Sequence, residues 1–359
     1  MPSTKKAAAP KTPKHAFGKT LKTFSTESGK EGQFYSLPAL AKQGLHQVRL
    51  VWDWRHPGVR EVLKVMGPAT LSSGMLQINV FVDLFFASGI SGAAAGLGYA
   101  GLLVQTPLGL LSNALLVPLL PVYARLTAPE DRPQLIARIR QGLMLSNASM
   151  LPLGALMIGL AGPIVALVYQ RGAFDQRASS LVASLLVAYG VGMPAYLARD
   201  VLVRVFYALG DANTPFRWSV GGIGLNAVFD WMLVGGPTPG WGLLLPKLSF
   251  GAPGLVLATA LVNIFTGLGL LLVLHRRLGG LPLGDWGKDT LKLLLASLVA
   301  GGAAWVLAFQ VHWPLGLVGL LLQNGLCAAL AVGIYGVLGS WSGVEEVRDV
   351  LRGLRLRRA

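Results

Sequence analysis

The chain has 359 residues, of which 53% are hydrophobic and only 13% are charged. A soluble protein usually carries about 25% charged residues, and the shortage here falls in long apolar blocks, which excludes an ordinary soluble domain. The net charge of +15 would suggest nucleic-acid binding only if the basic residues gathered on one exposed surface.

The first 45 residues form a basic arm that we predict to be disordered. The arm is rich in Lys, Ser, Thr, Pro and Ala and has no apolar period, which is typical of segments that cannot bury a core. It lacks the apolar stretch of a secretory signal, so we expect no cleaved signal here. We expect its lysines to lie near anionic lipids of the cytoplasmic leaflet, followed by a juxtamembrane amphipathic lead-in at residues 46–65.

Eight apolar segments follow, each long enough to cross a bilayer, which takes about 20 residues. They lie at 66–88, 94–122, 146–169, 180–208, 215–236, 252–274, 291–311 and 315–338. We therefore predict an all-α polytopic transmembrane bundle of about eight helices. It comprises a six-helix bundle at 66–275, two additional helices at 276–340 and a basic tail at 341–359. The stretch "PEDRPQLIARIRQGL" before the third span predicts an amphipathic helix on the membrane surface.

The basic residues predict the orientation of these spans. Among the 31 Lys and Arg residues, only Arg171, Arg177 and Lys247 fall in the connections on one side, and nearly all others lie on the opposite side. By the positive-inside rule, this places both termini in the cytoplasm of a bacterial inner-membrane protein. Because this pattern accounts for most of the net charge, we expect no nucleic-acid partner.

Asp83 and Asp230 are the first polar residues inside the spans that need an explanation, since a charge in hydrocarbon is costly. Each lies about five residues from the outer end of its span, on the order of 8 Å deep. Asn226 precedes Asp230 by one helical turn and shares its face, and Thr259 reaches a comparable depth in the next span.

Two carboxylates, an amide and a hydroxyl at one level are hard oxygen ligands that suit an alkali cation such as sodium. The carbonyl of Leu255 would complete the set. Two alternatives remain open from the residues alone. Asp83 and Asp230 could turn separately to the outer interface, or the two carboxyl groups could share a proton.

A second polar group lies in "LARDVLVRVFYALGDANTP", in the fourth span and the turn after it. Asp200 and Arg204 are spaced i, i+4, so we predict an intrahelical ion pair. Arg199 either extends to the interface or faces a cavity, and this polar end of the span could meet an anionic head group.

No enzyme or organic cofactor is predicted. The five histidines lie outside the span interiors, the sole cysteine Cys327 forms no disulfide framework, and no nucleophile–base–carboxylate set occurs. "GLGYAG" at 96–101 matches a dinucleotide-binding pattern, but no strand precedes it, and close helix packing explains its glycines better.

Several stretches resemble the MurJ/MviN family, the lipid II flippases of the multidrug/oligosaccharidyl-lipid/polysaccharide exporter superfamily. They are "GPATLSSGMLQINVFVDLFFAS", "YAGLLVQTPLGLLSNALLVPLLPVYARL", "YQRGAF" and "VLVRVFYALGDANTP". The resemblance covers about residues 45–275 well, and the R-x-F-Y-A-x-x-D-x-x-T-P stretch from Arg204 through Asp211 to Pro215 is its most specific part.

The resemblance implies export of an undecaprenyl-pyrophosphate-linked peptidoglycan precursor by ion-coupled alternating access. It also implies a sodium site on the helices that carry Asp83, Asn226, Asp230 and Thr259. The possible lipid-tail groove of this family corresponds to the two additional helices at 276–340.

Two departures from the family limit what we expect of this chain. The family has fourteen helices in two lobes, and the eight segments here resemble the C-terminal part, so we expect the N-terminal six helices to be lacking. Leu102 stands where the family usually carries an arginine. We therefore expect no flipping without a separate N-lobe. A related transporter of another lipid-linked saccharide and a truncated, non-transporting membrane scaffold are the alternatives.

Overall fold

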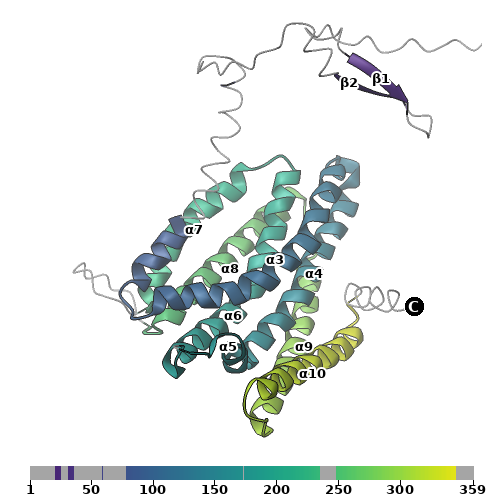
Figure 1. Cartoon of the computed structure of the whole chain (residues 1–359). Coiled ribbons are helices and arrows are strands. Elements are labelled where there is room, and N and C mark those ends of the chain that lie inside the picture. The colour runs from purple at the N-terminus through teal and green to yellow at the C-terminus, as the bar shows by residue number, and fades with distance from the viewer. Residues whose placement is uncertain are drawn as a thin grey trace, which may run out of the picture. The chain divides into compact units, whose positions relative to one another are not determined.

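The computed structural model describes residues 21–25, 31–35, 59, 78–172, 174–234 and 248–344, and the statements below refer to these residues. The first apolar helix of the bundle is described over Ile78–Ala87. It is followed by α3 (Ala93–Arg125), α4 (Arg132–Gly159), α5 (Ala161–Tyr169), α6 (Gln176–Ala208), α7 (Asn213–Val234), α8 (Ala252–Arg277), α9 (Leu283–Gln310) and α10 (Leu317–Trp341). Figure 1 shows these helices as one bundle.

The N-terminal arm differs in part from the prediction of disorder. Strand β1 (Leu21–Ser25) pairs antiparallel with β2 (Glu31–Tyr35). Thr, Phe and Tyr, which favour strands, occur in these two segments, and a short connection containing serine and glycine joins them. The other parts of the arm, nearly all of the 46–65 lead-in and the tail from residue 345 lie outside the described residues.

The helical membrane fold is confirmed. Six described helices are long and apolar enough to cross a bilayer: α3, the stretch Pro129–Gly159, α6, α8, α9 and α10. Helix α7 is not among the six, because Arg217, Asn226 and Asp230 interrupt its apolar sequence. Two of them, Asn226 and Asp230, are buried within the bundle.

The third predicted span has different bounds in the structure. Helix α4 runs without interruption from Arg132 to Gly159, so the predicted surface helix and the start of the third span are one helix. Pro133 does not prevent this, because proline is tolerated in the first turn of a helix. The predicted span is instead broken at Leu160, where α4 ends before α5 begins. The ring of Pro163 would collide with the carbonyl of Gly159 in a continuous helix, which explains the break.

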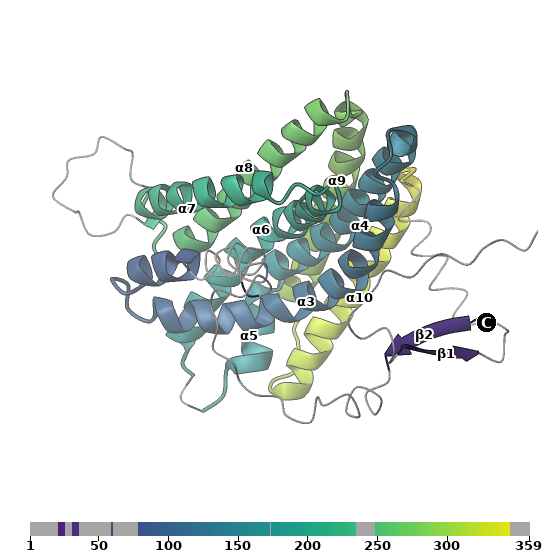
Figure 2. The ribbon, with the colours of Figure 1, turned by 90° about the horizontal axis from the view of Figure 1, so that it is seen from above.

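Helix α6 is the central element of the bundle and packs against α3, α4, α5 and α8, as the view from above shows (Figure 2). Its closest crossing is with α4, where the backbones touch. A Cβ atom at Gly190 would lie 2.7 Å from the carbonyl oxygen of Gly154, and the converse contact is closer still. Small residues at a membrane helix crossing permit this approach and the dispersion contacts that come with it.

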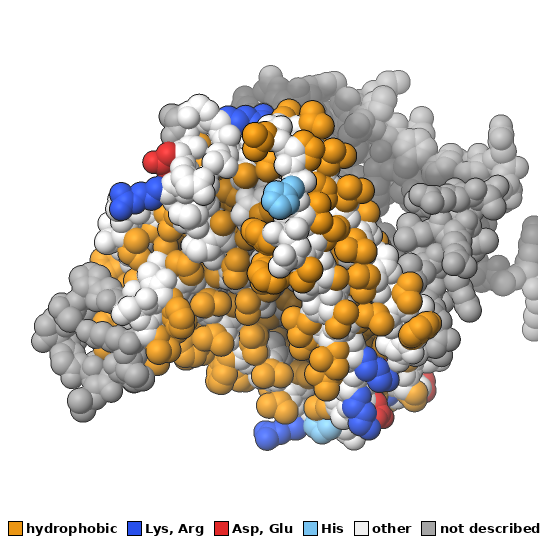
Figure 3. Space-filling view, turned by 90° about the horizontal axis from the view of Figure 1, so that it is seen from below, with side chains coloured by type: hydrophobic (Ala, Val, Ile, Leu, Met, Phe, Trp, Pro, Cys, Tyr) orange, Lys and Arg blue, Asp and Glu red, His pale blue; other side chains and the backbone are white. Residues whose placement is uncertain are grey.

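The surface of the bundle fits a hydrocarbon surrounding. Figure 3 shows a broad band of hydrophobic side chains between two edges where the charged side chains gather. Large apolar residues are exposed along α9 and α10, including Leu295, Val299, Leu321 and Val332. Contiguous exposed apolar surface of this extent is rare on soluble monomers, and it is what a multi-pass membrane protein presents to lipid.

Candidate functional site

The structure brings Asp83, Asn226, Asp230 and Thr259 together from three helices. Asp83 comes from the Ile78–Ala87 helix, Asn226 and Asp230 from α7, and Thr259 from α8. The amide nitrogen Nδ2 of Asn226 donates to Asp83 Oδ1 at 2.7 Å and to Asp230 Oδ2 at 2.9 Å. One amide group therefore bridges the two carboxyl groups, which do not turn separately toward the membrane surface.

Thr259 connects this cluster to the backbone of α8. Its hydroxyl Oγ1 lies 3.3 Å from Asn226 Oδ1 and 3.3 Å from the carbonyl oxygen of Leu255. The Thr259 hydroxyl also interacts with the Asp83 carboxyl group, so it joins the amide, a carboxyl group and the α8 backbone. All of the oxygen ligands predicted from the sequence are within one connected group.

The cluster is buried and one of its oxygens lacks a partner. Asn226 and Asp230 are each 0% exposed, and Asp230 Oδ1 has no hydrogen-bond partner among the described residues. Nearly all buried polar atoms in proteins are paired, so such an oxygen requires an explanation. Repulsion between the charges of the neighbouring Asp83 and Asp230 carboxyl groups adds to the free-energy cost of burying this oxygen.

Close packing of α7 against α8 makes the cluster possible. A Cβ atom at Gly222 would lie 3.2 Å from Val262, and one at Gly254 would lie 2.7 Å from the carbonyl oxygen of Leu233. These glycines lie on either side of the Asn226–Thr259 contact along the two helices. Because both lack a side chain, the helices approach closely enough for the short Asn and Thr side chains to meet.

A cavity of about 640 Å³ adjoins the cluster. Its wall is built from the first described helix, α3, α6, α7 and α8. The polar side chains that line it are Asn79, Asp83, Gln105, Tyr189, Tyr196, Arg199, Asp200, Tyr207, Ser219, Thr259, Asn263 and Thr266. The carboxylate cluster and the polar part of α6 therefore face one common space.

Arg199 faces this cavity, but the predicted partner of Asp200 is wrong. Arg199 donates to Ser219 Oγ at 3.1 Å, and its second terminal nitrogen lies 3.9 Å from Asp200 Oδ1. No ion pair within 4.0 Å joins Asp200 to Arg204, both of which the structure describes. Spacing along a helix permits an i, i+4 pair, but the neighbouring helices decide which way each side chain turns.

Asp211 has a structural role in the turn between α6 and α7. Its carboxylate accepts hydrogen bonds from the Thr214 backbone nitrogen at 3.0 Å and the Thr214 hydroxyl at 2.8 Å. It also pairs with Arg277 at the end of α8 at 2.8 Å. Burial raises the pKa of Asp211, but the hydrogen bonds from Thr214 and the Arg277 guanidinium outweigh it and hold the pKa below its ordinary value.

Two further residues at the cavity escaped the sequence reasoning. Asn263 Nδ2 donates to the carbonyl oxygen of Thr259 at 2.7 Å, and the buried Tyr196 hydroxyl has no partner among the described residues. Asn263 follows Thr259 by one turn, so the same-face rule that links Asn226 to Asp230 could have found it. No comparable signal identifies Tyr196, because tyrosine is common in apolar spans.

Comparison with known proteins identifies the family. The family described as "Lipid II flippase MurJ" matches residues 33–325. A Synechocystis protein described as "Probable lipid II flippase MurJ" is 50% identical over 265 residues, covering 74% of this chain and 47% of the relative. A Burkholderia cenocepacia protein described as "Lipid II flippase MurJ" is 28% identical over 304 residues, covering 82% and 56%.

A solved structure has the same fold. It is described as "Lipid II flippase MurJ, inward closed conformation" and superposes with a TM-score of 0.65 at 22% identity. The match covers 87% of this chain and 59% of that chain. The chain thus spans about half the length of the curated relatives it matches. The matched family is named for a transport activity, which agrees with the lack of enzyme signals in the sequence. This chain belongs to the MurJ family of lipid II flippases.

Proposed function

We propose that this chain forms the cation-binding lobe of a lipid II flippase. The cargo would be an undecaprenyl-pyrophosphate-linked peptidoglycan precursor, carried across the cytoplasmic membrane by ion-coupled alternating access. The proposal draws on the descriptions of the relatives. The observation that carries it is the buried Asp83–Asn226–Asp230 cluster beside the cavity.

Sodium is the coupling ion that we propose for this cluster. The carboxylates of Asp83 and Asp230, the Thr259 hydroxyl and the Leu255 carbonyl would hold it, with Asn226 as the fifth group. The unpaired Asp230 Oδ1 supports this assignment, since a buried acceptor without a donor suits a cation. A bound cation would supply the positive charge that offsets two adjacent carboxylates.

The Asn226 amide is suited to respond to the cation. Its nitrogen now faces both carboxyl groups and its oxygen faces Thr259. Half a turn of the amide would offer the oxygen to the carboxylate side, and the Thr259 hydroxyl can accept from the nitrogen. Since the ligands come from three helices, occupancy would favour the arrangement in which these helices are together.

The cavity of this lobe provides little positive charge for a pyrophosphate. Among the described residues that line the cavity, Arg199 is the one arginine. Its guanidinium already interacts with Ser219 and Asp200. Leu102, where relatives of this family usually carry an arginine, is 64% exposed. A diphosphate in a membrane cavity needs several cationic partners. We therefore propose that flipping requires the remaining length of the relatives, in the same polypeptide or as a separate lobe.

The sodium site is tested by thermal unfolding of the purified protein in sodium, potassium and choline chloride at equal ionic strength. We expect sodium to raise the unfolding temperature of the wild type, and Asp230→Asn and Asp83→Asn to abolish that rise. Asp200→Asn is the matched control, because Asp200 lines the same cavity outside the cluster. A sodium effect that survives in Asp230→Asn would refute the site.

The transport function is tested in bacterial cells depleted of their own lipid II flippase. We expect growth to recover when this chain is expressed with the complementary lobe of its relatives, and to fail with either part alone. Recovery should be lost in the Asp230→Asn variant. A failure to recover with both lobes present, while the protein is folded in the membrane, would favour a non-transporting scaffold or another lipid-linked cargo.

A further inference from the structure

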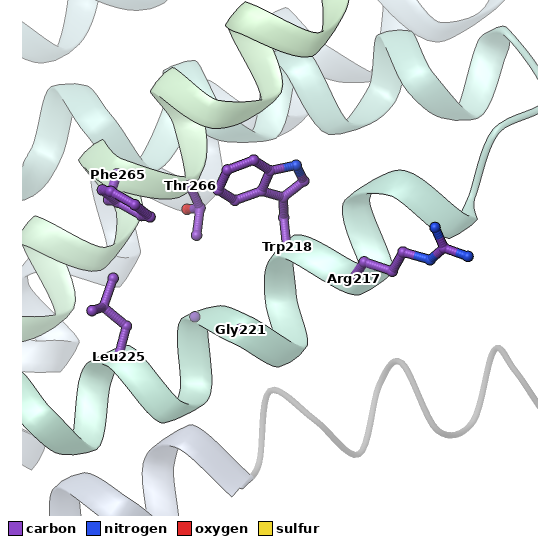
Figure 4. A pocket seen from close by; sticks show the side chains of 7 residues that line it. Arg217, Trp218, Gly221, Leu225, Phe265 and Thr266 are labelled. Atoms are coloured by element: carbon purple, nitrogen blue, oxygen red, sulfur yellow. The ribbon is translucent and has the colours of Figure 1, made fainter.

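A second recess lies between α7 and α8, separate from the main cavity. It has a volume of about 280 Å³ and is lined by Trp218, Gly221, Leu225 and Phe265, with Arg217 at one end. Figure 4 shows the Trp218 ring reaching from α7 toward α8, Leu225 and Phe265 at the opposite end, and Arg217 extending beyond Trp218. Gly222 and Thr266 line both this recess and the main cavity, so they form the wall between the two.

The shape of this recess is built into the packing. The indole of Trp218 lies directly over Gly269, where a Cβ atom would collide with the ring. The Trp218 and Phe265 rings are 6.0 Å apart and form one side of the recess. A Cβ atom at Gly221 would meet nothing within 4 Å, so the space above this glycine is empty. A narrow apolar chain fits such a groove without any repacking of the protein.

The groove opens on the apolar exterior of the bundle. Phe265 is 55% exposed, and Leu261, Leu268 and Leu272 continue the same exposed stripe along α8. The spacing of these residues places them on one face of the helix. In a multi-pass membrane protein, an exposed apolar stripe of this kind faces lipid acyl chains.

Arg217 gives the groove a charged end. Within the described residues, no carboxylate pairs with Arg217, whereas Arg140, Arg199 and Arg277 all have acidic partners. Arg217 and Trp218 lie in the second turn of α7, which is the level where Arg and Trp anchor helices at the membrane interface. A free guanidinium at that level is complementary to a lipid phosphate.

We propose that this groove is a binding site for an anionic phospholipid of the bilayer. One acyl chain lies along Trp218, Gly221 and Phe265, and the head-group phosphate contacts Arg217. Basic pockets between transmembrane helices bind anionic head groups in this manner. The inference goes beyond the proposed flippase activity, because it depends on neither the cargo nor the coupling ion.

The test uses the full chain in detergent, titrated with phospholipids whose acyl chains carry bromine, which quenches nearby tryptophan. We expect brominated phosphatidylglycerol to quench at about fivefold lower concentration than brominated phosphatidylcholine, the contribution of one arginine near the membrane surface. Arg217→Gln should remove this preference. Trp218→Phe should remove the preferential part of the quenching, which identifies the groove as the site.

Two matched controls separate the groove from general lipid contact. Gly221→Leu fills the groove and should weaken quenching by both lipids, whereas Gly224→Leu should not, because Gly224 has open space around it and lies outside the groove. Arg276→Gln removes an exposed arginine elsewhere and should keep the preference. Equal quenching by the two lipids in the wild type would overturn the proposal. It would also be overturned if Arg276→Gln removed the lipid preference as Arg217→Gln does, or if Gly224→Leu weakened quenching as much as Gly221→Leu. Absence of quenching by either lipid would also overturn it and would indicate that protein covers the groove.

Discussion

Asn226 is the residue on which the polar cluster depends. Its single amide nitrogen satisfies one oxygen of each carboxyl group, and its oxygen receives the Thr259 hydroxyl. Without it, the two carboxyl groups would lose the one donor that contacts both of them in an apolar interior. The alternative in which Asp83 and Asp230 turn separately to the outer interface does not fit this geometry.

We expect Asn226→Ala to lower the free energy of unfolding by about 3 kcal/mol, because it leaves buried carboxyl groups without a donor. Adding Asp83→Asn to that variant should recover part of the loss, since it removes one charge and supplies a new amide. Thermal unfolding of the three variants measures both effects. Asn263→Ala, which removes one amide bond to the Thr259 carbonyl, is the control and should cost less. A double variant no more stable than Asn226→Ala would argue against direct coupling of Asp83 and Asn226.

Asp211 predicts how stability depends on pH. Folding lowers the pKa of the Asp211 carboxyl group. The stability that its charge contributes to the folded state is therefore fully present above the ordinary pKa of 3.8, and it is lost as the pH falls through the lower pKa of the folded state. We expect Asp211→Asn to cost about 0.5–1 kcal/mol near neutral pH, because it removes the charge that pairs with Arg277 while asparagine can still cap the helix. The difference from the wild type should shrink below pH 3.8, as followed by unfolding temperature against pH. Asp285→Asn removes an exposed carboxylate paired only with Lys288, and it should change stability little at any pH. A constant difference across the acid range would contradict this account of Asp211.

At the scale of elements, the bundle is organised by glycine contacts with α6 at the centre. Gly154 of α4 meets Gly190 of α6, and Gly192 of α6 lies beside Ala260 of α8. Helix α9 is joined to α4 by the close approach of Gly301 to Ala155, with polar contacts from Arg140 to Asp289 and from Asn147 to Thr290. Small residues thus set the distances between helices, and the polar pairs align them.

We expect Gly154→Ala to destabilise the bundle by about 1–3 kcal/mol, because the new methyl group collides with the Gly190 backbone and overpacks the crossing. Gly98→Ala provides a control of opposite sign. A Cβ at Gly98 meets nothing within 4 Å, so relief of backbone entropy should make it neutral or stabilising by about 0.5–1 kcal/mol. Unfolding temperatures in one detergent compare the two. Equal effects of both substitutions would show that the crossing is not as close as the structure has it.

At the scale of the whole molecule, a multi-pass bundle presents two ends of different charge. Exposed arginines and lysines gather where α3 ends, α4 begins, and α8 leads into α9, whereas Arg171 and Arg177 lie near the α5–α6 connection. We propose that the richer end faces the cytoplasm, in accord with the positive-inside rule. The proposed phospholipid groove has its charged end near the start of α7, so this orientation would place Arg217 at the cytoplasmic leaflet.

Single cysteines test this orientation in whole cells. Cys327, the sole cysteine and 0% exposed, is first replaced by alanine. We expect Arg177→Cys to react with a membrane-impermeant maleimide in cells with a permeable outer membrane. Glu130→Cys, at the start of the stretch that leads into α4, should react only after the inner membrane is opened. The reverse pattern of labelling would invert the orientation, and the Cys327→Ala parent should remain unlabelled.

Local sequence patterns are sufficient to predict a multi-pass membrane protein, the bounds of most of its helices and the depth of its buried polar residues. Hydropathy and helical rise are local properties, so spans such as those around α6 and α8 can be read from about 20 residues without knowledge of their neighbours. Depth alone was sufficient to place Asp83, Asp230 and Thr259 at one level. The spacing of four residues places Asn226 on the same helix face as Asp230.

Which of these groups touch depends on how the helices pack, and local sequence patterns do not contain that information. The rotation of each helix and its distance from the next depend on crossings such as Gly222 against Val262, which involve residues distant in sequence. For this reason the sequence assigned Asp200 to Arg204, whereas the structure pairs it with Arg199. For the same reason the bridging role of Asn226, the shared cavity and the groove beside Trp218 could not be foreseen. Depth is set by position along a helix, but contact is set by how the helices pack.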